Sequence, residues 1–495
     1  MAKEQRTIFI IFGGSGDLAH RKLYPALFKL YIKGYLREHF AVIGTARRPW
    51  SHEYFRQTVM ESIGADIGDQ EKISAFAQHF YYQSHDVNDA SHYVALKKLA
   101  LQLSDQYQTQ ENQIFYMAVA PRFFGTVASH INSEGLLTKS GYNRLVIEKP
   151  FGRDLQSATE LNNSIAATFK EEQIYRIDHY LGKEMIQALP MLRFTNPILE
   201  AIWNHQYLSN VQITLAETLG VGERAGYYET AGALRDMIQN HALQILGLIA
   251  MEKPDEFSSA AVHQQKSALF AQLPLYSASE VDHNFVRGQY GVDKRGNQTA
   301  YRQADNVADN SNIETFVAGK IMIDNPRWRG VPFYVRSGKR LRQKTTRIDL
   351  VFKTSSNKIF TRDQLRKGNT QPMVLSIFVE PTQGISLTIN GTNPGMGLHP
   401  FLHKLNFQQS AEEMTNSQEA YEKLLIDIIQ GNQTNFTNWQ EQEYTWRFID
   451  QIRQRWDQVK AEFPNYYSNS FGPQSSVELL AHDGNEWVWG PESVQ

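Results

Sequence analysis

The chain of 495 residues contains no cysteine. This absence excludes disulfide bonds, a catalytic thiolate and metal sites built from cysteine, and it fits a reducing compartment. Neither sign of charge prevails, because 50 basic and 52 acidic residues leave a formal net charge of −2. Such a balance provides no field suited to nucleic acid, so we expect no nucleic-acid partner.

Long hydrophobic runs are also missing. The longest one, Ala242–Met251, contains Gln244 and has about half of the length that spans a bilayer. Residues 1–6 lead into a strand-like stretch without the apolar core and the cleavage site of a signal peptide. We therefore expect a cytoplasmic protein that does not bind membranes.

What is present is typical of a large globular protein. Hydrophobic residues make up 41% of the chain and charged residues 21%. A chain of this length exceeds one ordinary hydrophobic core, so two or more domains are expected.

The first third of the chain alternates short apolar runs with amphipathic stretches. The strand-like runs are Thr7–Phe12, Phe40–Gly44, Phe80–Gln83, Gln113–Val119, Arg144–Glu148 and Gln173–Ile177. The helix-like stretches lie near 18–33, 52–63, 89–103, 122–132 and 155–169. This alternation predicts βαβ units and a doubly wound parallel sheet, the α/β class.

The pattern changes beyond about residue 185. Apolar runs follow one another without regular intervening helices at Val211–Leu215, Arg347–Phe352, Met373–Val379 and Ile385–Ile389, and long helical patterns come near 417–430 and 437–461. This order predicts an α+β domain with a mainly antiparallel sheet. We therefore expect a dinucleotide-binding domain over residues 1–178 and a larger substrate-binding and dimerisation domain over 179–495.

A glycine-rich turn follows the first predicted strand. Gly14-x-Gly16-x-x-Ala19 matches the fingerprint of dinucleotide-binding, Rossmann-like domains, and Gly13-x-x-Gly16-x-x-Ala19 is an equally good register. Glycines at these positions let the main chain approach a pyrophosphate, whose charge meets a helix N-terminus. The position between a strand and a helix is the context that this motif requires.

Two further strand ends carry basic residues. The second strand ends before Arg47 and Arg48, where an NAD site usually offers an acidic residue to the ribose. Arginine suits a 2′-phosphate, so NADP is the predicted coenzyme, with NAD as a possible alternative. Lys149 ends the fifth strand, and Pro150 restricts its main chain to extended conformations, which fixes where its side chain points.

The segment Arg176–Glu184 holds the densest group of side chains suited to catalysis or anion binding. It places Asp178, His179, Tyr180 and Lys183 within six residues. In a helix starting after Asp178, His179 and Lys183 would share one face, and the polar groups would converge on an anion such as a phosphate. The alternative is a solvated helix start with Asp178 as its N-cap.

The chain has fifteen histidines, and His241 differs from the others by its setting. It follows Ala231–Asn240 and leads into an apolar, helix-like stretch. Alcohol oxidation with a nicotinamide needs a base for the hydroxyl proton, which a histidine oriented by a carboxylate can supply. By itself, His241 is better explained as a half-buried packing residue.

These motifs together resemble those of the glucose-6-phosphate dehydrogenase family. The resemblance rests on Gly13–Leu18, Glu148–Gly152, Arg176–Lys183, Arg235–His241 and Val335–Lys339, in the family's order. It runs from about residue 6 to beyond residue 440, and the enzymes of lactic-acid bacteria are the most similar in pattern. The resemblance implies oxidation of glucose 6-phosphate at C1 to the 6-phospho-δ-lactone by NADP, without a metal.

The resemblance also implies roles for individual residues. His241 would be the general base, and Asp178 would orient it. The substrate would be bound by Lys149, His179, Tyr180, Lys183, Glu217, Asp236, Lys339 and Lys344. The coenzyme would be bound by Gly13, Gly14, Ser15, Gly16, Asp17, Leu18, Lys22, Arg47, Arg48 and again Lys149.

Several of these residues also have ordinary explanations. Lys339 and Lys344 could belong to a solvated strand edge, Glu217 could close a strand, and Asp236 could pair with Arg235 or Arg224. The alternatives to the enzyme are an NADP-sensing protein without activity and a dehydrogenase of another sugar phosphate. Because the family is typically dimeric through its large sheet, a homodimer is the expected assembly.

Overall fold

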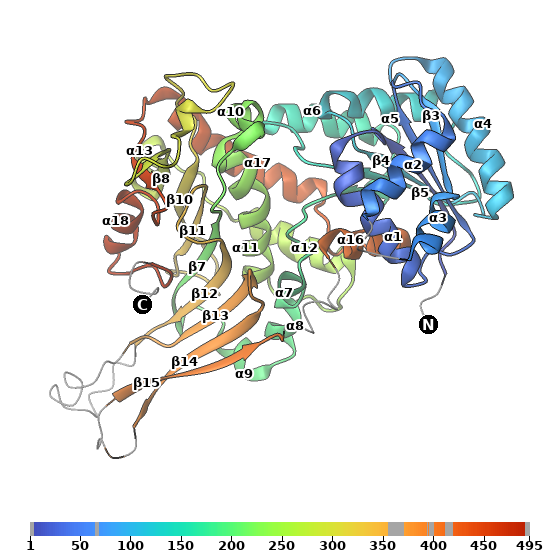
Figure 1. The fold of residues 1–495 in the computed structure, drawn as a ribbon. Helices are drawn as coiled ribbons and strands as arrows, with labels where there is room; N and C mark the ends of the chain where they lie inside the picture. The colour runs from blue at the N-terminus through green and yellow to red at the C-terminus, as the bar shows by residue number, and fades with distance from the viewer. Residues whose placement is uncertain are drawn as a thin grey trace. The chain divides into compact units, whose positions relative to one another are not determined.

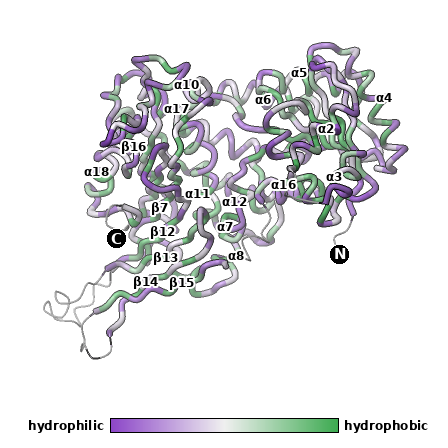
Figure 2. Tube along the Cα trace, viewed as in Figure 1, coloured by the Kyte–Doolittle hydropathy of each residue, from purple (hydrophilic) through white to green (hydrophobic). Residues whose placement is uncertain are grey.

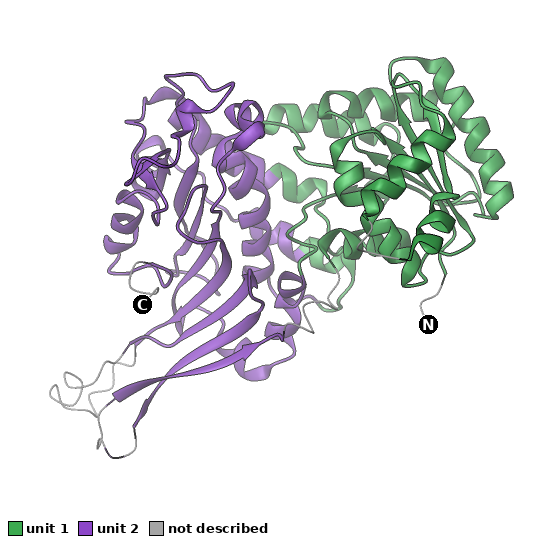
Figure 3. Cartoon of the chain, viewed as in Figure 1, with its two compact units in different colours: residues 1–183, 255–264, 418–443 green, residues 184–254, 265–417, 444–495 purple. Residues whose placement is uncertain are grey.

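The computed structural model describes residues 4–64, 69–354, 371–393, 395, 400–410 and 419–490 (Figure 1). The chain divides into two compact units (Figure 3). The first comprises Met1–Lys183, Asp255–Gln264 and Gln418–Glu443, and the second Glu184–Pro254, Gln265–Ser417 and Tyr444–Gln495. The predicted division into 1–178 and 179–495 differs from these units, because two later segments belong to the first unit.

The first unit is built on a parallel sheet of six strands in the order β3-β2-β1-β4-β5-β6. This is the strand order of dinucleotide-binding domains. The strands are β1 (Thr7–Phe12), β2 (Phe40–Ala46), β3 (Phe80–Ser84), β4 (Gln113–Met117), β5 (Asn143–Ile147) and β6 (Ile174–Arg176). The predicted strands are confirmed to within two residues at their ends, and the predicted α/β class of this part is confirmed.

Helices connect the strands of this sheet. They are α1 (Tyr24–Ile32), α2 (His52–Ile63), α3 (Gln70–Ala77), α4 (Ala90–Tyr107), α5 (Phe124–Ser133) and α6 (Leu155–Ala166). Helix α3 was not predicted. The stretch predicted as one helix over 18–33 begins with a π-helix, Ala19–Leu23 (η1), before α1.

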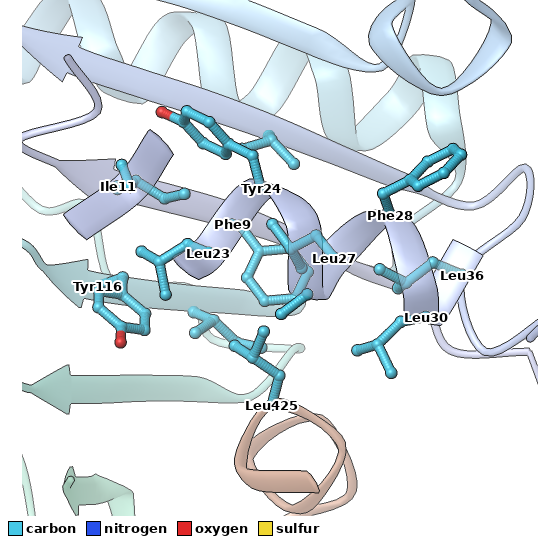
Figure 4. Close-up of a cluster of buried hydrophobic side chains, with 14 of the residues drawn as sticks. Phe9, Ile11, Leu23, Tyr24, Leu27, Phe28, Leu30, Leu36, Tyr116 and Leu425 are labelled. Atoms are coloured by element: carbon cyan, nitrogen blue, oxygen red, sulfur yellow. The ribbon is translucent and has the colours of Figure 1, made fainter. Parts of the chain in front are cut away.

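The core of the first unit takes in a segment from late in the chain. All residues of β1 and β4 are buried, as expected for strands covered on both faces. Figure 4 shows Leu425, from α16 (Ala420–Gln430), among side chains of β1, α1 and β4. Leu424, Leu425, Ile428 and Ile429 belong to this cluster, so α16 completes the hydrophobic core of the unit. This packing is why the unit does not end at residue 183.

Ion pairs with α1 hold α16 as well, and the carboxylate of Glu422 in two of them is buried. Lys29 of α1 lies 2.7 Å from Glu419 and 3.2 Å from Glu422, and Lys33 lies 2.5 Å from Glu422. The apolar residues of the unit are concentrated in its interior, drawn mostly green in Figure 2, whereas its outer loops are largely purple. The helix therefore combines a buried apolar face with a charged rim.

The second unit is built on a sheet of eight strands in the order β15-β14-β13-β12-β7-β11-β10-β8. All neighbouring pairs are antiparallel except β7 and β11. The strands are β7 (Leu208–Ala216), β8 (Phe285–Gly288), β10 (Phe316–Ile321), β11 (Phe333–Gly338), β12 (Thr345–Phe352), β13 (Val374–Glu380), β14 (Gly384–Thr392) and β15 (Pro400–Gln408). The prediction of an α+β domain with a mainly antiparallel sheet is confirmed.

The second unit is richer in helices than the sequence suggested. Between residues 184 and 284 lie α7 (Glu184–Gln187), α8 (Leu189–Phe194), α9 (Pro197–Ile202), α10 (Ala225–Ala233), the π-helix η5 (Leu234–Ala242), α11 (Leu243–Ala250) and α13 (Ala278–Asn284). Two helices, α12 (Ser259–Phe270) and α17 (Trp439–Gln458), have residues in both units, and α18 (Ser475–Ala481) lies near the C-terminus. The expectation that regular helices are missing between the strands was therefore wrong for this part.

The long helical patterns predicted late in the chain are present. The stretch 437–461 contains α17, and the stretch 417–430 contains α16, although residues 417 and 418 lie outside the described part. Within the described residues, no helix is both long enough and apolar enough to cross a membrane.

Candidate active site

The coenzyme side of the candidate site begins where β1 ends. The main-chain N–H groups of Gly13 and Gly14 donate to Thr45 O at 2.8 and 3.0 Å, which ties the loop to β2. Gly13 has a φ of +92°, and a Cβ at this position would lie 2.2 Å from the carbonyl oxygen of Ala118. No side chain fits there, so the main chain is free to approach a pyrophosphate.

Tyr24 supports the same loop and was not predicted from the sequence. Its hydroxyl donates a hydrogen bond to Gly14 O. The side chain is fully buried, and burial raises the pKa of the hydroxyl well above its usual range. The hydroxyl therefore remains a donor at every physiological pH. Its position just past the glycine fingerprint, on the first regular helix, is the signal that could have pointed to it.

Arg47 and Arg48 follow β2, and both side chains are exposed. The hydroxyl of Tyr82 donates to Arg48 O at 2.7 Å and to Ala46 O at 3.0 Å, so the main chain of this turn is fixed while the guanidinium groups reach solvent. A surface hollow of ≈ 530 Å³ is lined by Ser15, Gly16, Ala46, Arg47 and Arg48. The glycine loop and the two arginines thus share one hollow, which fits a phosphate-bearing coenzyme.

The remaining predicted coenzyme residues lie around this loop. Asp17 is exposed and pairs with Arg21 at 3.4 Å, and Lys22 is exposed on η1. Leu18 is half-buried. The structure therefore brings the loop, Arg47 and Arg48 to one hollow, whereas Asp17 faces solvent beside an arginine.

Lys149 lies just beyond β5, after the half-buried carboxylate of Glu148. Glu148 Oε1 accepts hydrogen bonds from the hydroxyls of Tyr116, at 2.5 Å, and Tyr421, at 3.2 Å. Burial raises the pKa of Glu148, and the two hydroxyls oppose this rise. The Lys149-Pro150 peptide bond is cis. The main chain beside Lys149 is thus anchored at the carboxyl edge of the parallel sheet, where such sheets hold ligands.

The segment after β6 forms turns and not the helix considered above. Leu181 N donates to Asp178 O at 3.0 Å, and Lys183 N donates to Tyr180 O at 3.0 Å. Asp178 Oδ1 accepts from Tyr180 N at 2.9 Å, and the residue is only 3% exposed. An aspartate that bonds its own downstream main chain favours a turn over a helix, which explains the difference.

The turns still gather the predicted phosphate ligands. The ring of Tyr180 lies 4.9 Å from the ring of His179, and Lys183 Nζ lies 4.0 Å from the centre of the Tyr180 ring. Tyr180 is nearly buried, whereas His179 and Lys183 are half-buried. An imidazole, a phenol and an ammonium are thus held together, as a phosphate site requires.

Gly182 permits this arrangement. A Cβ on Gly182 would lie 2.7 Å from the carbonyl oxygen of Ala420, the first residue of α16. The late helix therefore contacts the phosphate segment directly, and the glycine leaves room for it.

In the second unit, Glu217 and Lys339 meet at the ends of β7 and β11. Lys339 Nζ lies 2.5 Å from Glu217 Oε2, and Glu217 N donates to Gly338 O at 2.9 Å. The same ammonium lies 5.1 Å from the ring of Tyr228. Tyr228 was not predicted; it is 2% exposed, and its hydroxyl has no hydrogen-bond partner among the described residues.

Charge surrounds the Tyr228 hydroxyl. Its burial and the nearby carboxylates of Asp236 and Glu217 raise its pKa well above the usual range. The hydroxyl is therefore a neutral donor and acceptor among two carboxylates and an ammonium. This combination is suited to the hydroxyl groups of a sugar.

Asp236 and His241 lie together on the π-helix η5. Asp236 is 5% exposed and accepts a hydrogen bond from the hydroxyl of Tyr227 at 3.4 Å, and His241 is fully buried. π-Helical turns are rare and are often found at functional sites, and the sequence pattern gave no sign of this one.

Lys344 is the predicted residue with the most ordinary setting. Its side chain is 57% exposed and lies 3.2 Å from Glu380. Asp178 and His241 belong to different compact units, so a hydrogen bond between them stays a prediction. The structure thus forms two groups of predicted residues, one in each unit.

Comparison with known proteins extends along the whole chain. Residues 10–188 match the family model described as the NAD binding domain of glucose-6-phosphate dehydrogenase, and residues 190–488 match its C-terminal domain. Glucose-6-phosphate 1-dehydrogenase from Leuconostoc mesenteroides is 46% identical over 489 residues, which cover 99% of this chain and 100% of that protein. The protein of the same name from Streptococcus pneumoniae is 46% identical over 490 residues, covering 98% and 97%.

Solved structures agree with these matches. A glucose-6-phosphate dehydrogenase in complex with its substrate glucose 6-phosphate has a TM-score of 0.90 and 32% identity, covering 99% of this chain and 100% of the other. A glucose-6-phosphate 1-dehydrogenase from Mycobacterium avium has a TM-score of 0.82 and 28% identity, covering 98% and 99%.

Proposed function

The chain belongs to the glucose-6-phosphate dehydrogenase family, and from this membership we propose that it oxidises the C1 hydroxyl of D-glucose 6-phosphate, yielding 6-phospho-D-glucono-1,5-lactone. It is an oxidoreductase whose reaction is the first step of the pentose phosphate pathway. The observation that carries the proposal is the match along nearly the full length of both domains, together with the polar segment Arg176–Glu184.

The chemical step is assigned to His241 and Asp178. His241 takes the proton of the C1 hydroxyl while hydride leaves the same carbon, and its full burial excludes competing water. Asp178 accepts a hydrogen bond from the imidazole, which sets its tautomer and stabilises the imidazolium that forms. When bound, the nicotinamide supplies the hydride acceptor.

The phosphate end of the substrate is assigned to His179, Tyr180 and Lys183. Their mutual contacts at 4.9 and 4.0 Å support this assignment, because they keep three side chains that can donate to a phosphate next to one another. Such a cluster favours glucose 6-phosphate over free glucose, because only the phosphate accepts charge-assisted hydrogen bonds from these donors.

The sugar hydroxyls are assigned to Glu217, Asp236, Lys339 and Lys344, with Lys149 between substrate and coenzyme. The Glu217–Lys339 pair, at 2.5 Å, supports this assignment because each partner already satisfies the charge of the other. A sugar hydroxyl can then donate to the carboxylate and accept from the ammonium. Lys344 requires its exposed contact with Glu380 to open, so its contribution is the smallest.

NADP is the proposed coenzyme, and NAD is the alternative to it. The glycine loop fits a pyrophosphate, since a Cβ on Gly13 or Gly14 would collide with the main chain of Ala118 or Gly44. Arg47 and Arg48 supply the charge for a 2′-phosphate, while an NAD site is served by an acidic residue. Substituting each arginine by alanine is expected to raise the KM for NADP about 10-fold or more, with little change for NAD, because a charged hydrogen bond contributes about 1.5–3 kcal/mol. Equal effects on both coenzymes would refute the assignment.

A homodimer in the cytoplasm is proposed as the working form. The edge strand β15 exposes Phe401, Leu405 and Phe407, which are 44%, 56% and 58% exposed. These residues alternate along the strand, so they share one face of the sheet and offer an apolar surface to a second copy. Light scattering after gel filtration should give twice the chain mass, and Leu405→Lys should shift it toward the monomer. A monomeric wild-type protein would contradict this.

The activity itself is tested by the absorbance of reduced nicotinamide with glucose 6-phosphate and NADP. A panel of glucose, other hexose 6-phosphates and NAD defines the substrate. His241→Asn should fold and bind glucose 6-phosphate but lose about 10²–10⁴-fold in kcat, the usual contribution of acid–base catalysis. Near-normal turnover in this variant would show that another group is the base, and no turnover by the wild-type protein would refute the proposed function.

A further inference from the structure

Glu314 is a fully buried carboxylate of the second unit that has no role in the site described above. It lies two residues before β10 and close to the junction between α10 and η5. Its side chain is 0% exposed, and a charge without partners at such a place would be strongly destabilising. Its contacts therefore show which parts of the structure this carboxylate stabilises.

Both the side chain and the main chain of Glu314 accept hydrogen bonds from the start of η5. Oε1 accepts from Leu234 N at 3.1 Å, and the main-chain oxygen accepts from Ala233 N at 3.0 Å. The first N–H groups of a helix have no acceptor within the helix, and a carboxylate there also meets the positive end of the helix dipole. Glu314 thus caps η5 from a distant part of the chain.

The second carboxylate oxygen is held by Arg453 of α17. Arg453 Nη1 lies 2.9 Å from Glu314 Oε2, and the arginine is 4% exposed. Asp457 contacts the same guanidinium at 2.6 Å. Because a buried ion pair is costly to break on one side, this contact fixes the position of the carboxylate.

Gly232 makes room for the carboxylate. Its φ is +66°, and a Cβ at this position would lie 2.3 Å from Glu314 Oε1. The glycine breaks α10 at the point where η5 follows, so the chain changes direction beside Glu314. Gly232 and Glu314 therefore together determine where η5 begins.

We infer that Glu314 is a positioning residue for catalysis: it fixes the start of η5 and thereby the placement of Asp236 and His241. The inference rests on the proposed function, because it assigns importance to the helix that carries the base. Asp236 lies at the third position of η5 and His241 at the eighth, so a shift of the first turn moves both. A displacement of about 1 Å in a catalytic group costs up to about 100-fold in rate.

The test compares Glu314→Ala, Glu314→Gln and Glu314→Asp in the full-length protein, assayed well below each melting temperature. Alanine removes the acceptor for Leu234 N–H, so kcat should fall about 10- to 100-fold and the KM for glucose 6-phosphate should rise. Glutamine keeps a neutral acceptor and should restore kcat to within about threefold of the wild type. Aspartate keeps the charge, but its shorter side chain moves the carboxylate oxygen away from Leu234 N–H. This variant should lower kcat about 10-fold.

Asp349→Asn is the matched control, since it also weakens a buried ion pair of the second unit. Asp349 is 1% exposed and binds Arg347 at 2.5 Å and Ser376 at 2.6 Å, neither of which belongs to η5. It should lower the melting temperature and leave kcat unchanged. The KM for the coenzyme should stay at the wild-type value in every variant, because the proposed coenzyme residues belong to the first unit.

Wild-type kcat in Glu314→Ala, despite a lower melting temperature, would overturn the inference. If alanine does not fold, wild-type kcat in Glu314→Asp would overturn it equally. An equal loss of kcat in the glutamine and alanine variants would also overturn it, because glutamine keeps the hydrogen-bond acceptor that alanine removes. These outcomes are distinct from a wild-type protein that does not oxidise glucose 6-phosphate, which would refute the proposed function instead.

Discussion

The acid stability of the first unit is expected to depend on His85. This residue follows β3, is 1% exposed, and neither ring nitrogen has a hydrogen-bond partner among the described residues. Burial, and then the nearby His92, lower the pKa of His85 to about 4, against the opposing charges of Asp86 and Asp89. The imidazole is therefore neutral at physiological pH.

The sign of the effect follows from where the proton binds. In the unfolded chain the histidine takes up a proton below its ordinary pKa of 6.5, whereas in the folded chain it does so only near pH 4. The contribution of His85 to the free energy of unfolding is therefore fully present above pH 6.5, and it is lost as the pH falls toward 4. Each pH unit in this window costs about 1.4 kcal/mol, so the whole window costs about 3 kcal/mol.

The measurement is urea unfolding at several pH values between 4.5 and 7.5, with His85→Phe compared with the wild type. Phenylalanine suits the aromatic neighbours Phe12 and Tyr93, whose rings lie 5.7 and 4.5 Å away. The variant should lose less stability on acidification, by up to about 3 kcal/mol. Phe12→Leu is the control, since it weakens the same core by a constant amount at every pH. If the free energy of unfolding falls equally with pH in His85→Phe and in the wild type, the reasoning is refuted.

Three further outcomes are expected. Lys183→Gln should raise the KM for glucose 6-phosphate and reduce the preference over free glucose, and an unchanged preference in a substrate panel would remove Lys183 from the phosphate site. Tyr24→Phe should weaken coenzyme binding and lower the free energy of unfolding by about 1 kcal/mol each, because it leaves Gly14 O without this donor. Coenzyme titration and melting curves measure the two effects, and wild-type coenzyme binding would show that the loop does not need the hydrogen bond from Tyr24. Leu425→Ala should lower the free energy of unfolding by about 2–5 kcal/mol, and a loss below 1 kcal/mol would contradict a buried place for α16 in the first core.

Local signals made much of the first unit predictable. Buried parallel strands are continuous apolar runs, and a glycine fingerprint between a strand and a helix indicates both the fold and its ligand. Arg47, Arg48 and Gly13 were predicted as coenzyme residues in this way, because the roles proposed for them depend on neighbours in the sequence. The strand limits followed from the same runs.

The features that were missed depend on contacts between distant residues. The apolar periodicity of α16 predicts a helix, but it does not indicate which core receives that helix. Tyr228 and Glu314 each resemble ordinary residues until the strands and helices around them are assembled. The close approach of Gly182 to Ala420 in the segment after Asp178 likewise involves residues far apart in the sequence, and no local pattern contains it.

The late entry of α16 into the first core bears on how the protein is made. Synthesis from the N-terminus normally lets an early domain fold before the rest of the chain appears. Here the side chains of Phe9, Leu27 and Tyr116 gain their neighbours Leu425 and Ile428 only after more than four-fifths of the chain has left the ribosome. The growing chain must therefore keep an apolar surface of its coenzyme domain exposed for most of its synthesis. A fragment ending at Lys183 should bind chaperones or aggregate, and a supplied α16 peptide should rescue it.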